Sequence, residues 1–265
     1  MTPPRPPAAR NAAGRPAAAR PGAAPLLVVC ALAPERWALR GGDWTVSRET
    51  GEPAAEAMLI RTGMGPERAR RSVSALLEGG SGGGRDYGAL LITGFCAAVA
   101  LGIHPGEAIV PEEVSHGGGA SVEIASSGLL AGTLCASGLT VHTGRLHSAE
   151  RVVHGAGARG RLRAAGVVGV DLETAAVLDA ARQAAPGLPA AAMRIVVDTP
   201  GRELLRPGTV PNGIRAWHAL RAAVPAFVAW HRALASPGDP PDRTPTPTAI
   251  PTPETLNRTL PQEAS

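Results

Sequence analysis

The sequence predicts an α/β fold with a central mixed, mostly parallel sheet covered by helices. Continuous apolar runs bounded by Gly and Pro alternate with segments of helical period. Strands that are buried on both faces have uninterrupted apolar sequences, because neither face of the sheet meets water. Without its low-complexity ends, the chain of 265 residues leaves about 210 residues, enough for one well-buried domain.

The expected strands are short apolar runs. PLLVVCAL (25–32) and ALLITGFCAAV (89–99) are the clearest, because each is followed by Gly, Pro or small residues. EAIVPEEV (107–114) and MRIVVDTP (193–200) have the same character, and AMLIRTG (57–63) has it more weakly. These segments are the predicted strands of the sheet.

Helical patterns lie between and after these strands. GPERARRSVSALLEGG (65–80) ends in two glycines, which stop a helix, and DLETAAVLDAARQAAPG (171–187) has acidic residues in its first turn. The apolar face of the first of these helices consists of Ala69, Val73, Leu76 and Leu77. The segment 213–235 is one helix kinked at Pro225 or two helices in succession, since Pro cannot continue helical hydrogen bonding. GGSGGG (79–84) is expected to be a flexible surface connection.

Both ends of the chain are predicted to be disordered. Residues 1–24 are almost wholly Pro, Ala, Arg and Gly, and residues 236–265 repeat Pro and Thr. Neither tail buries enough apolar surface to offset the entropy of ordering. The domain is therefore placed at residues 25–235.

Composition excludes several classes of function. The chain has a net charge of +4 and no lysine, so a lysine Schiff base and a Walker-type phosphate loop are ruled out. Several arginines lie in the tails, and one Tyr and two Phe leave little for base stacking, so no nucleic-acid partner is expected. No secretory signal and no transmembrane run of ~20 apolar residues is found. A cytoplasmic protein is expected, with peripheral membrane contact left open.

Cys30, Cys96 and Cys135 are widely spaced and form no CxxC pair. A structural zinc site or a disulfide framework is therefore not predicted, and no metal ligand is assigned. Cys30 and Cys96 lie in or next to apolar runs, where buried free thiols are common. An iron–sulfur cluster on the three cysteines is the alternative.

Four motifs contain the candidate chemistry. In chain order they are CALAPER (30–36), TGMG (62–65), GVDLETAAVLDAA (169–181) and MRIVVDTPGREL (193–204). This series resembles the purine nucleoside phosphorylase and nucleosidase superfamily, especially the methylthioadenosine/S-adenosylhomocysteine nucleosidases. The VDxE and RIVxDxPxREL patterns resemble the hopanoid-associated phosphorylases more closely. The resemblance covers roughly residues 25–234 and implies a three-layer phosphorylase/hydrolase-like fold.

The resemblance also implies roles for three carboxylates. Breaking the C1′–N9 bond of a nucleoside gives an oxocarbenium-like sugar and a purine anion. By resemblance, Asp198 is the acid at the purine N7, Glu173 binds the ribose hydroxyls and Glu35 activates water. Asp198 follows three apolar residues, so we expect desolvation to raise its pKa toward that of a general acid.

Each carboxylate has a structural alternative without chemistry. The alternative for Asp198, which the motif context does not favour, is a helix N-cap before Thr199-Pro200, and for Glu173 it is an acidic residue in the first turn of a helix. Asp171 fits that capping role better than Glu173. For Glu35, activation of water and a solvent-facing position are weighed evenly, because an acid directly after Pro34 suits a solvent-facing position as well.

The remaining pocket is assigned by the same resemblance. The predicted substrate-binding residues are Glu173, Leu172, Gly63, Gly65, Thr93, Gly94, Phe95, Val152 and Val153. Gly63 and Gly65 would let backbone amides approach an anion or water near C1′. Leu172 replaces a methionine under the sugar, and Val152 replaces an aromatic stacked on the base, a role that Phe95 or a tryptophan could take. His142 and His147 are expected to be hydrogen-bonded structural residues, with a place for His147 in the pocket wall left open.

The nucleophile is predicted to be water. The segment LLITGFCAA (90–98) lacks the arginine with which true phosphorylases clamp phosphate. Arg61 and Arg68 lie near the TGMG turn and could bind phosphate in place of the missing arginine. Phosphate is therefore kept as the alternative co-substrate.

The expected reaction is therefore N-glycosidic cleavage of a 5′-substituted adenine nucleoside of the adenosylhopane type, in hopanoid biosynthesis, releasing adenine. No organic cofactor is implied, and the resemblance implies a homodimer. Trp217, Phe227 and Trp230 are the candidates for an apolar mouth around the 5′ substituent. The alternatives are methylthioadenosine, S-adenosylhomocysteine or futalosine as substrate, a non-catalytic purine-nucleoside-binding protein, and an iron–sulfur reductase.

Overall fold

The apolar runs of the sequence form one sheet in the computed structural model, which describes residues 24–45, 57–79, 87–117, 121–199 and 209–235. Within these ranges eight strands are joined in the order β2-β1-β3-β7-β6-β4-β5, and β8 pairs with both β3 and β4. The strands are β1 (Leu26–Cys30), β2 (Ala57–Arg61), β3 (Ala89–Ala98), β4 (Ala108–Ser115), β5 (Ser121–Glu123), β6 (Val141–Ser148), β7 (Val167–Asp171) and β8 (Ala190–Asp198).

Most strand pairs are parallel, so the predicted mixed, mostly parallel sheet is confirmed. β1 is parallel to β2 and β3, β3 is parallel to β8, and β6 is parallel to β4 and β7. The antiparallel pairs are β3 with β7, β4 with β5, and β4 with β8. Because β8 joins β3 to β4 and β7 joins β3 to β6, these five strands form a closed circuit of pairing.

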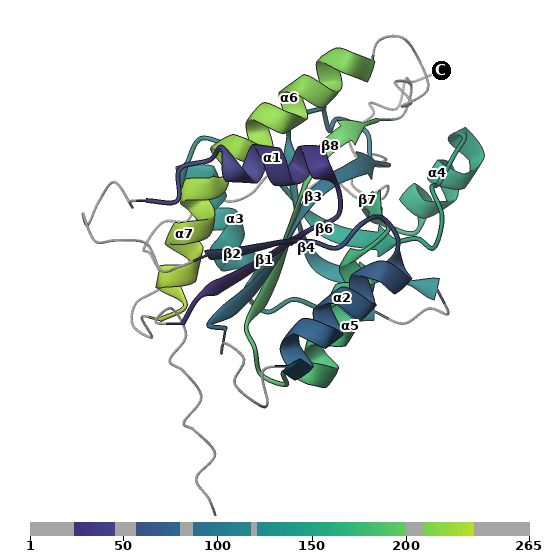
Figure 1. The fold of residues 1–265 in the computed structure, drawn as a ribbon. Helices are drawn as coiled ribbons and strands as arrows, with labels where there is room; N and C mark the ends of the chain where they lie inside the picture. Colours follow the sequence, from purple (N-terminus) through teal and green to yellow (C-terminus); the bar gives the residue numbers. More distant parts are fainter. Residues whose placement is uncertain (1–23, 46–56, 80–86, 118–120, 200–208, 236–265) are drawn as a thin grey trace, which may run out of the picture.

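Helices cover both faces of the sheet (Figure 1). They are α1 (Ala33–Arg40), α2 (Pro66–Glu78), α3 (Ser127–Ala136), α4 (Ala156–Ala164), α5 (Thr174–Ala184), α6 (Thr209–Ala222) and α7 (Val224–Ala233). α2 and α5 pack together on one face, whereas α1, α3, α6 and α7 lie on the other, and α4 stands at the edge (Figure 1). The three-layer arrangement is the predicted one.

The helix patterns read from the sequence match two of these helices closely. On α2, Ala69 and Val73 are fully buried, and Leu76 and Leu77 pack against the core while partly exposed. At the C-terminal end, the alternative of two helices is correct. α7 begins with Pro225 in its first turn, the position where a missing amide costs least.

Several elements were not predicted. α1 has only eight residues, α3 is apolar nearly all round and so lacks an amphipathic period, and α4 is rich in arginine and glycine. Among the strands, β5, β6 and β7 were missed. β6 is mostly polar, with Val141 and Leu146 as its only large apolar residues, and β7 has only five residues, with Gly169 among them, so neither shows a long apolar run.

Three sequence predictions fall on residues outside the described ranges. These are the tail 236–265, the tail 1–24 except for Ala24, and the connection 79–84 except for Gly79. Among the helices that the structure does describe, none combines the length and the apolar character needed to cross a bilayer.

Candidate active site

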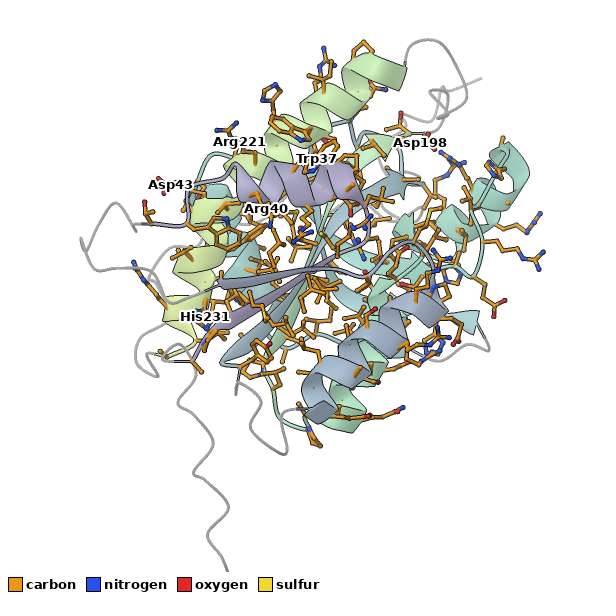
Figure 2. The ribbon with its side chains drawn as sticks, viewed as in Figure 1. Trp37, Arg40, Asp43, Asp198, Arg221 and His231 are labelled. Carbon is orange, nitrogen blue, oxygen red and sulfur yellow. The ribbon has the colours of Figure 1, made fainter. Side chains whose placement is uncertain are left out.

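A cavity of about 440 Å³ lies at the carboxyl ends of β1, β3, β7 and β8. The carboxylates Glu35, Glu173 and Asp198 all line it, although they are far apart in the sequence. Asp198 is seen at the end of β8, between α6 and α4 (Figure 2). The carboxyl ends of neighbouring strands form a crevice in open α/β sheets, so a ligand site is expected at this place.

Glu35 lies in the first turn of α1 and is buried, so the alternative of a solvent-facing acid is wrong. Its Oε2 accepts hydrogen bonds from the amides of Ala31 (2.9 Å) and Leu32 (2.7 Å). Its Oε1 accepts the amide of Phe95 on β3 at 2.7 Å. Burial is the main cause that raises the pKa of this carboxyl, although Arg194 and the three amides act in the opposite direction.

A glycine at position 94 makes room for Glu35. A Cβ on Gly94 would lie 2.5 Å from Oε1 of Glu35 and 2.9 Å from Nη1 of Arg194. The φ of +145° at Gly94 also lies in the region that favours glycine. β3 therefore accommodates a carboxylate and a guanidinium directly against its backbone.

Glu173 follows β7 and precedes α5, and its side chain faces the cavity instead of capping the helix. Its Oε1 accepts the amide of Gly65 at 2.9 Å. That amide was expected to approach an anion or water near C1′, and it binds this carboxylate instead. Burial is the largest influence on Glu173 and raises the pKa of its carboxyl.

Arg194 of β8 is a buried cation behind the cavity that the sequence analysis did not single out. Its Nη2 lies 2.5 Å from Oδ2 of Asp171 and 4.0 Å from Oε2 of Glu173. It also donates to the hydroxyl of Thr174 and to the carbonyl of Thr93. The one signal in the sequence was a charged residue inside the apolar run MRIVV.

Asp171 combines two structural tasks. It accepts the amide of Thr174, the first residue of α5, at 3.0 Å, so the capping role predicted for it is correct. It is also the ion-pair partner of Arg194 and accepts the hydroxyl of Ser148. The start of α5 and the buried cation are thereby fixed to the same carboxylate.

Asp198 is buried at the end of β8, where its partner is Arg159 of α4. Nη2 of Arg159 lies 2.6 Å from Oδ2 of Asp198, and Nη1 lies 3.3 Å from Oδ1. This bidentate ion pair was not expected, because desolvation alone was predicted to act on Asp198. A register shift between Cys96 and Ala97 sets Asp198 opposite Ala97, so a β-bulge accompanies its position.

The other predicted binding residues divide into two groups. Leu172, Phe95, Val152 and Val153 line the cavity. Gly63, Gly65, Thr93 and Gly94 are close in sequence to its walls but do not line it. The hydroxyl of Thr93 is fully buried and has no hydrogen-bond partner within the described part of the chain.

The apolar mouth is built differently from the prediction. Trp217 of α6 lines the cavity, but Phe227 and Trp230 are fully buried in the core, so the expectation for these two is wrong. Met64 and Val152 line the cavity while 56% and 49% exposed. These two side chains therefore extend from the cavity to the surface.

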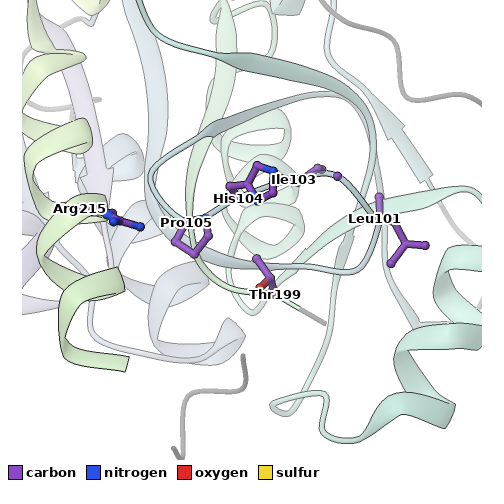
Figure 3. Close-up of a pocket in the computed structure, with 8 residues that line it drawn as sticks. Leu101, Ile103, His104, Pro105, Thr199 and Arg215 are labelled. Atoms are coloured by element: carbon purple, nitrogen blue, oxygen red, sulfur yellow. The ribbon is translucent and has the colours of Figure 1, made fainter. Parts of the chain in front are cut away.

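A second, smaller cavity of about 320 Å³ lies between the turn after β3 and α6 (Figure 3). Leu101, Ile103, His104 and Pro105 form one wall, and Arg215 faces them from α6. Thr199, the residue after Asp198, also lines it. The two cavities thus adjoin at the end of β8.

The histidines and cysteines lie mostly outside the main cavity. Nε2 of His142 is 2.8 Å from Glu107, and Nδ1 of His147 is 3.2 Å from Ser115, consistent with structural roles. Cys96 of β3 lines the cavity. Within the residues of known placement, the structure contains no group of three His, Cys, Asp or Glu side chains arranged to hold a metal ion.

The family model of the phosphorylase superfamily matches residues 45–211. No curated protein matches the sequence significantly.

Solved structures with the same fold include two methylthioadenosine/S-adenosylhomocysteine nucleosidases. For the Neisseria meningitidis protein, in complex with methylthio-immucillin-A, the TM-score is 0.61 at 18% identity, over 79% of this chain and 99% of the other. For the Campylobacter jejuni protein, the TM-score is 0.62 at 12% identity, over the same shares. Futalosine hydrolase of Helicobacter pylori gives 0.59 at 11% identity, over 79% and 97%. At these identities the likeness concerns the fold.

Proposed function

The chain belongs to the phosphorylase superfamily, and on that premise we propose that it hydrolyses the N-glycosidic bond of a 5′-substituted adenine nucleoside. The observation that supports this most directly is the meeting of Glu35, Glu173 and Asp198 in one cavity. N-glycosidic cleavage needs a group at the base, a group at the sugar and an activated nucleophile. The three carboxylates supply one candidate for each task.

Glu35 is the proposed base for the attacking water. A carboxylate has about four lone-pair sites, and the amides of Ala31, Leu32 and Phe95 occupy three of them. One acceptor site is left on a side chain that lines the cavity. The raised pKa of Glu35 brings it closer to the operating pH, as general base catalysis requires.

In the proposed step, the C1′–N9 bond breaks and its electron pair leaves with the purine, while the water oxygen bonds to C1′. The water gives one proton to Glu35, and the departing purine takes up one proton. The products are adenine and a 5-substituted ribose.

Glu173 is the proposed ribose anchor. The amide of Gly65 takes one lone pair of Oε1, which leaves acceptor sites for the 2′- and 3′-hydroxyls of a sugar. Leu172 lines the cavity beside it and is the apolar surface on which the sugar would rest. An ionised carboxylate makes stronger hydrogen bonds to hydroxyls than a neutral group does.

Water is proposed over phosphate as the nucleophile. Arg159 and Arg194, the buried arginines that the structure describes near the cavity, are both engaged by carboxylates. Arg61 and Arg68, the substitutes considered from the sequence, are exposed and do not line the cavity. A phosphate dianion would meet Glu35, Glu173 and Asp198 there, and the described residues that line the cavity include no free cation.

The 5′ substituent is proposed to be apolar, of the adenosylhopane type. Met64, Val152 and Trp217 line the mouth of the cavity, and the first two are largely exposed. An exposed apolar rim beside a polar interior suits a substrate with a polar base and sugar and an apolar extension. Methylthioadenosine, S-adenosylhomocysteine and futalosine are the alternative substrates, and the predicted homodimer and cytoplasmic location stay predictions.

The test is adenine release from a panel of adenosines that carry different 5′ substituents, assayed with and without phosphate. We expect phosphate-independent release that is fastest with apolar 5′ groups, and free ribose product rather than ribose 1-phosphate. Asp198→Asn should lower kcat by about 10²- to 10⁴-fold while binding is kept. Binding of nucleosides without any base release would instead identify a non-catalytic purine-nucleoside-binding protein and refute the proposal.

A further inference from the structure

The guanidinium of Arg159 lies on the wall of the cavity, in a bidentate pair with Asp198. Arginine has five N–H donors, and the carboxylate of Asp198 takes two of them. Nε of Arg159 is buried and has no hydrogen-bond partner within the described residues. Because Nε is closed off from the cavity as well, the donors of Arg159 that remain for a ligand are the other N–H groups of Nη1 and Nη2.

The pair offers a donor and an acceptor side by side, since Nη2 of Arg159 and Oδ2 of Asp198 are 2.6 Å apart. The Hoogsteen edge of adenine, which carries N7 and the N6 amino group, offers the complementary pattern, because N7 is an acceptor and the amino group is a donor. A 6-oxopurine has two acceptors on this edge, and its oxygen would face the carboxylate unfavourably.

We propose that Arg159 contacts the base of the substrate, donating a hydrogen bond to N7 while Asp198 accepts one from the N6 amino group. This inference rests on the proposed nucleoside cleavage and adds to it a residue that discriminates the base and stabilises the leaving group. It also changes the role expected for Asp198, which orients Arg159 and the base instead of protonating N7.

The charge of Arg159 suits this task. The electron pair of the broken C1′–N9 bond moves onto the purine, so negative charge develops on the ring during the reaction. A guanidinium keeps its proton throughout the physiological range and stabilises that charge as a fixed cation. The purine leaves as an anion hydrogen-bonded at N7 and takes its proton from solvent, while Glu35 receives the proton of the attacking water.

The pH behaviour separates this role from a protonated Asp198. Among the residues that the structure describes, the other titratable groups around this end of the cavity are Glu35, Cys96, Asp171, Glu173 and, behind it, Arg194. With Arg159 as donor to N7, kcat should stay level from neutral pH to about pH 9, because arginine does not lose its proton there. With a carboxylic acid as donor, kcat would fall as the pH rises through the pKa of that acid.

A purely structural role for Arg159 is the rival. It is the one fully buried residue of α4, so it also anchors that helix. Loss of the anchor would lower stability and activity together. It would not create a new pH dependence of kcat, and it would not change how strongly binding depends on N7 of the base. The matched control is Arg163, an exposed arginine one turn further along the same helix.

The experiment compares Arg159→Met with Arg163→Met in the full chain. We expect Arg159→Met to lose about 10²- to 10³-fold in kcat and to show a new decline of kcat at basic pH, because Asp198 must then supply the proton. Arg159→Lys should retain part of the rate and the level profile. Arg163→Met should match the wild type in both.

Binding of adenosine and 7-deazaadenosine provides a readout that does not need turnover. The 7-deaza analogue lacks the N7 acceptor, so the wild type should bind it about 10- to 100-fold more weakly than adenosine, and Arg159→Met should bind the two nearly equally. Equal discrimination in wild type and Arg159→Met, or a basic decline of kcat already present in the wild type, would overturn the inference. Adenine release by a wild type that fails this binding test would leave the proposed function standing. Absence of release with the expected binding difference would refute only the proposed function.

Discussion

The guanidinium of Arg194 and the carboxylate of Asp171 lie 2.5 Å apart, and each side chain is only 1% exposed. Arg194 is also the cation that opposes the effect of burial on Glu35 and Glu173. Isolated buried charges cost several kcal/mol, so one arginine compensates several carboxylates around the cavity. The candidate active site and the stability of the fold therefore depend on the same side chain.

We predict that Arg194→Met lowers the free energy of unfolding by about 3–5 kcal/mol, because it leaves Asp171 buried without its partner. Arg194→Lys keeps the charge but loses the planar fork, and should cost less. Urea denaturation followed by circular dichroism measures both. A loss below about 1 kcal/mol for Arg194→Met would show that the pair does not compensate these carboxylates.

A second prediction concerns the space beside Glu35. A Cβ at Gly94 would come within 2.5 Å of Oε1 of Glu35, so Gly94→Ala must displace that carboxylate or the strand. We expect a loss of about 1–3 kcal/mol in stability and a large loss of kcat in assays of adenine release. Gly128→Ala is the control. Gly128 lies in α3 with nothing within 4 Å of a Cβ, so alanine there should be neutral or stabilise by up to about 1 kcal/mol. Equal effects of both changes would contradict this prediction.

The pH profile of kcat/KM on its acid side is the third prediction. Glu35 must be ionised to accept a proton from water, and Glu173 must be ionised to bind hydroxyls strongly. Burial raises both pKa values above the ordinary 4.5. Activity should therefore rise with pH through a range above 4.5, and two protons should be lost in that range. In Glu173→Gln only the proton of Glu35 should remain in the profile. If the acid side of the wild-type profile has its midpoint at or below pH 4.5, burial does not set the pKa values of Glu35 and Glu173.

How much of this arrangement could be predicted depends on the type of element. Asp198 and Glu173 were assigned by the resemblance of their motifs to a known family, and each also ends an apolar strand or precedes a helix, a position that is visible in the sequence. The strands β1, β3 and β8 were found from their apolar runs. β6 and β7 were missed because β6 is mostly polar and β7 is only five residues long, so the local pattern of each is weak.

The two arginines of the site could not be assigned from the sequence. Arg159 is one of three arginines in the segment ARGRLR (158–163), and only the docking of α4 decides which of them is buried. Arg194 lies within an apolar run, and from the sequence alone a charged residue there suggests that the strand ends. Ion pairs such as Arg159–Asp198 join residues 39 positions apart, and partner choice at that separation is a property of the tertiary structure.

The last prediction tests Glu173 as the ribose anchor by pairing a side-chain change with a change in the sugar. Glu173→Gln keeps an oxygen to accept the Gly65 amide but loses the charge, so kcat/KM should fall by about 10- to 100-fold. Removal of the 3′-hydroxyl from the nucleoside should cost the wild type a similar factor and should cost the variant much less, since the two changes disrupt one interaction. Glu67→Gln, at an exposed position of α2, is the control and should leave both rates unchanged. If the losses from Glu173→Gln and from the 3′-deoxy sugar multiply as independent effects, Glu173 does not bind that hydroxyl, and the assignment of the sugar end of the cavity is wrong.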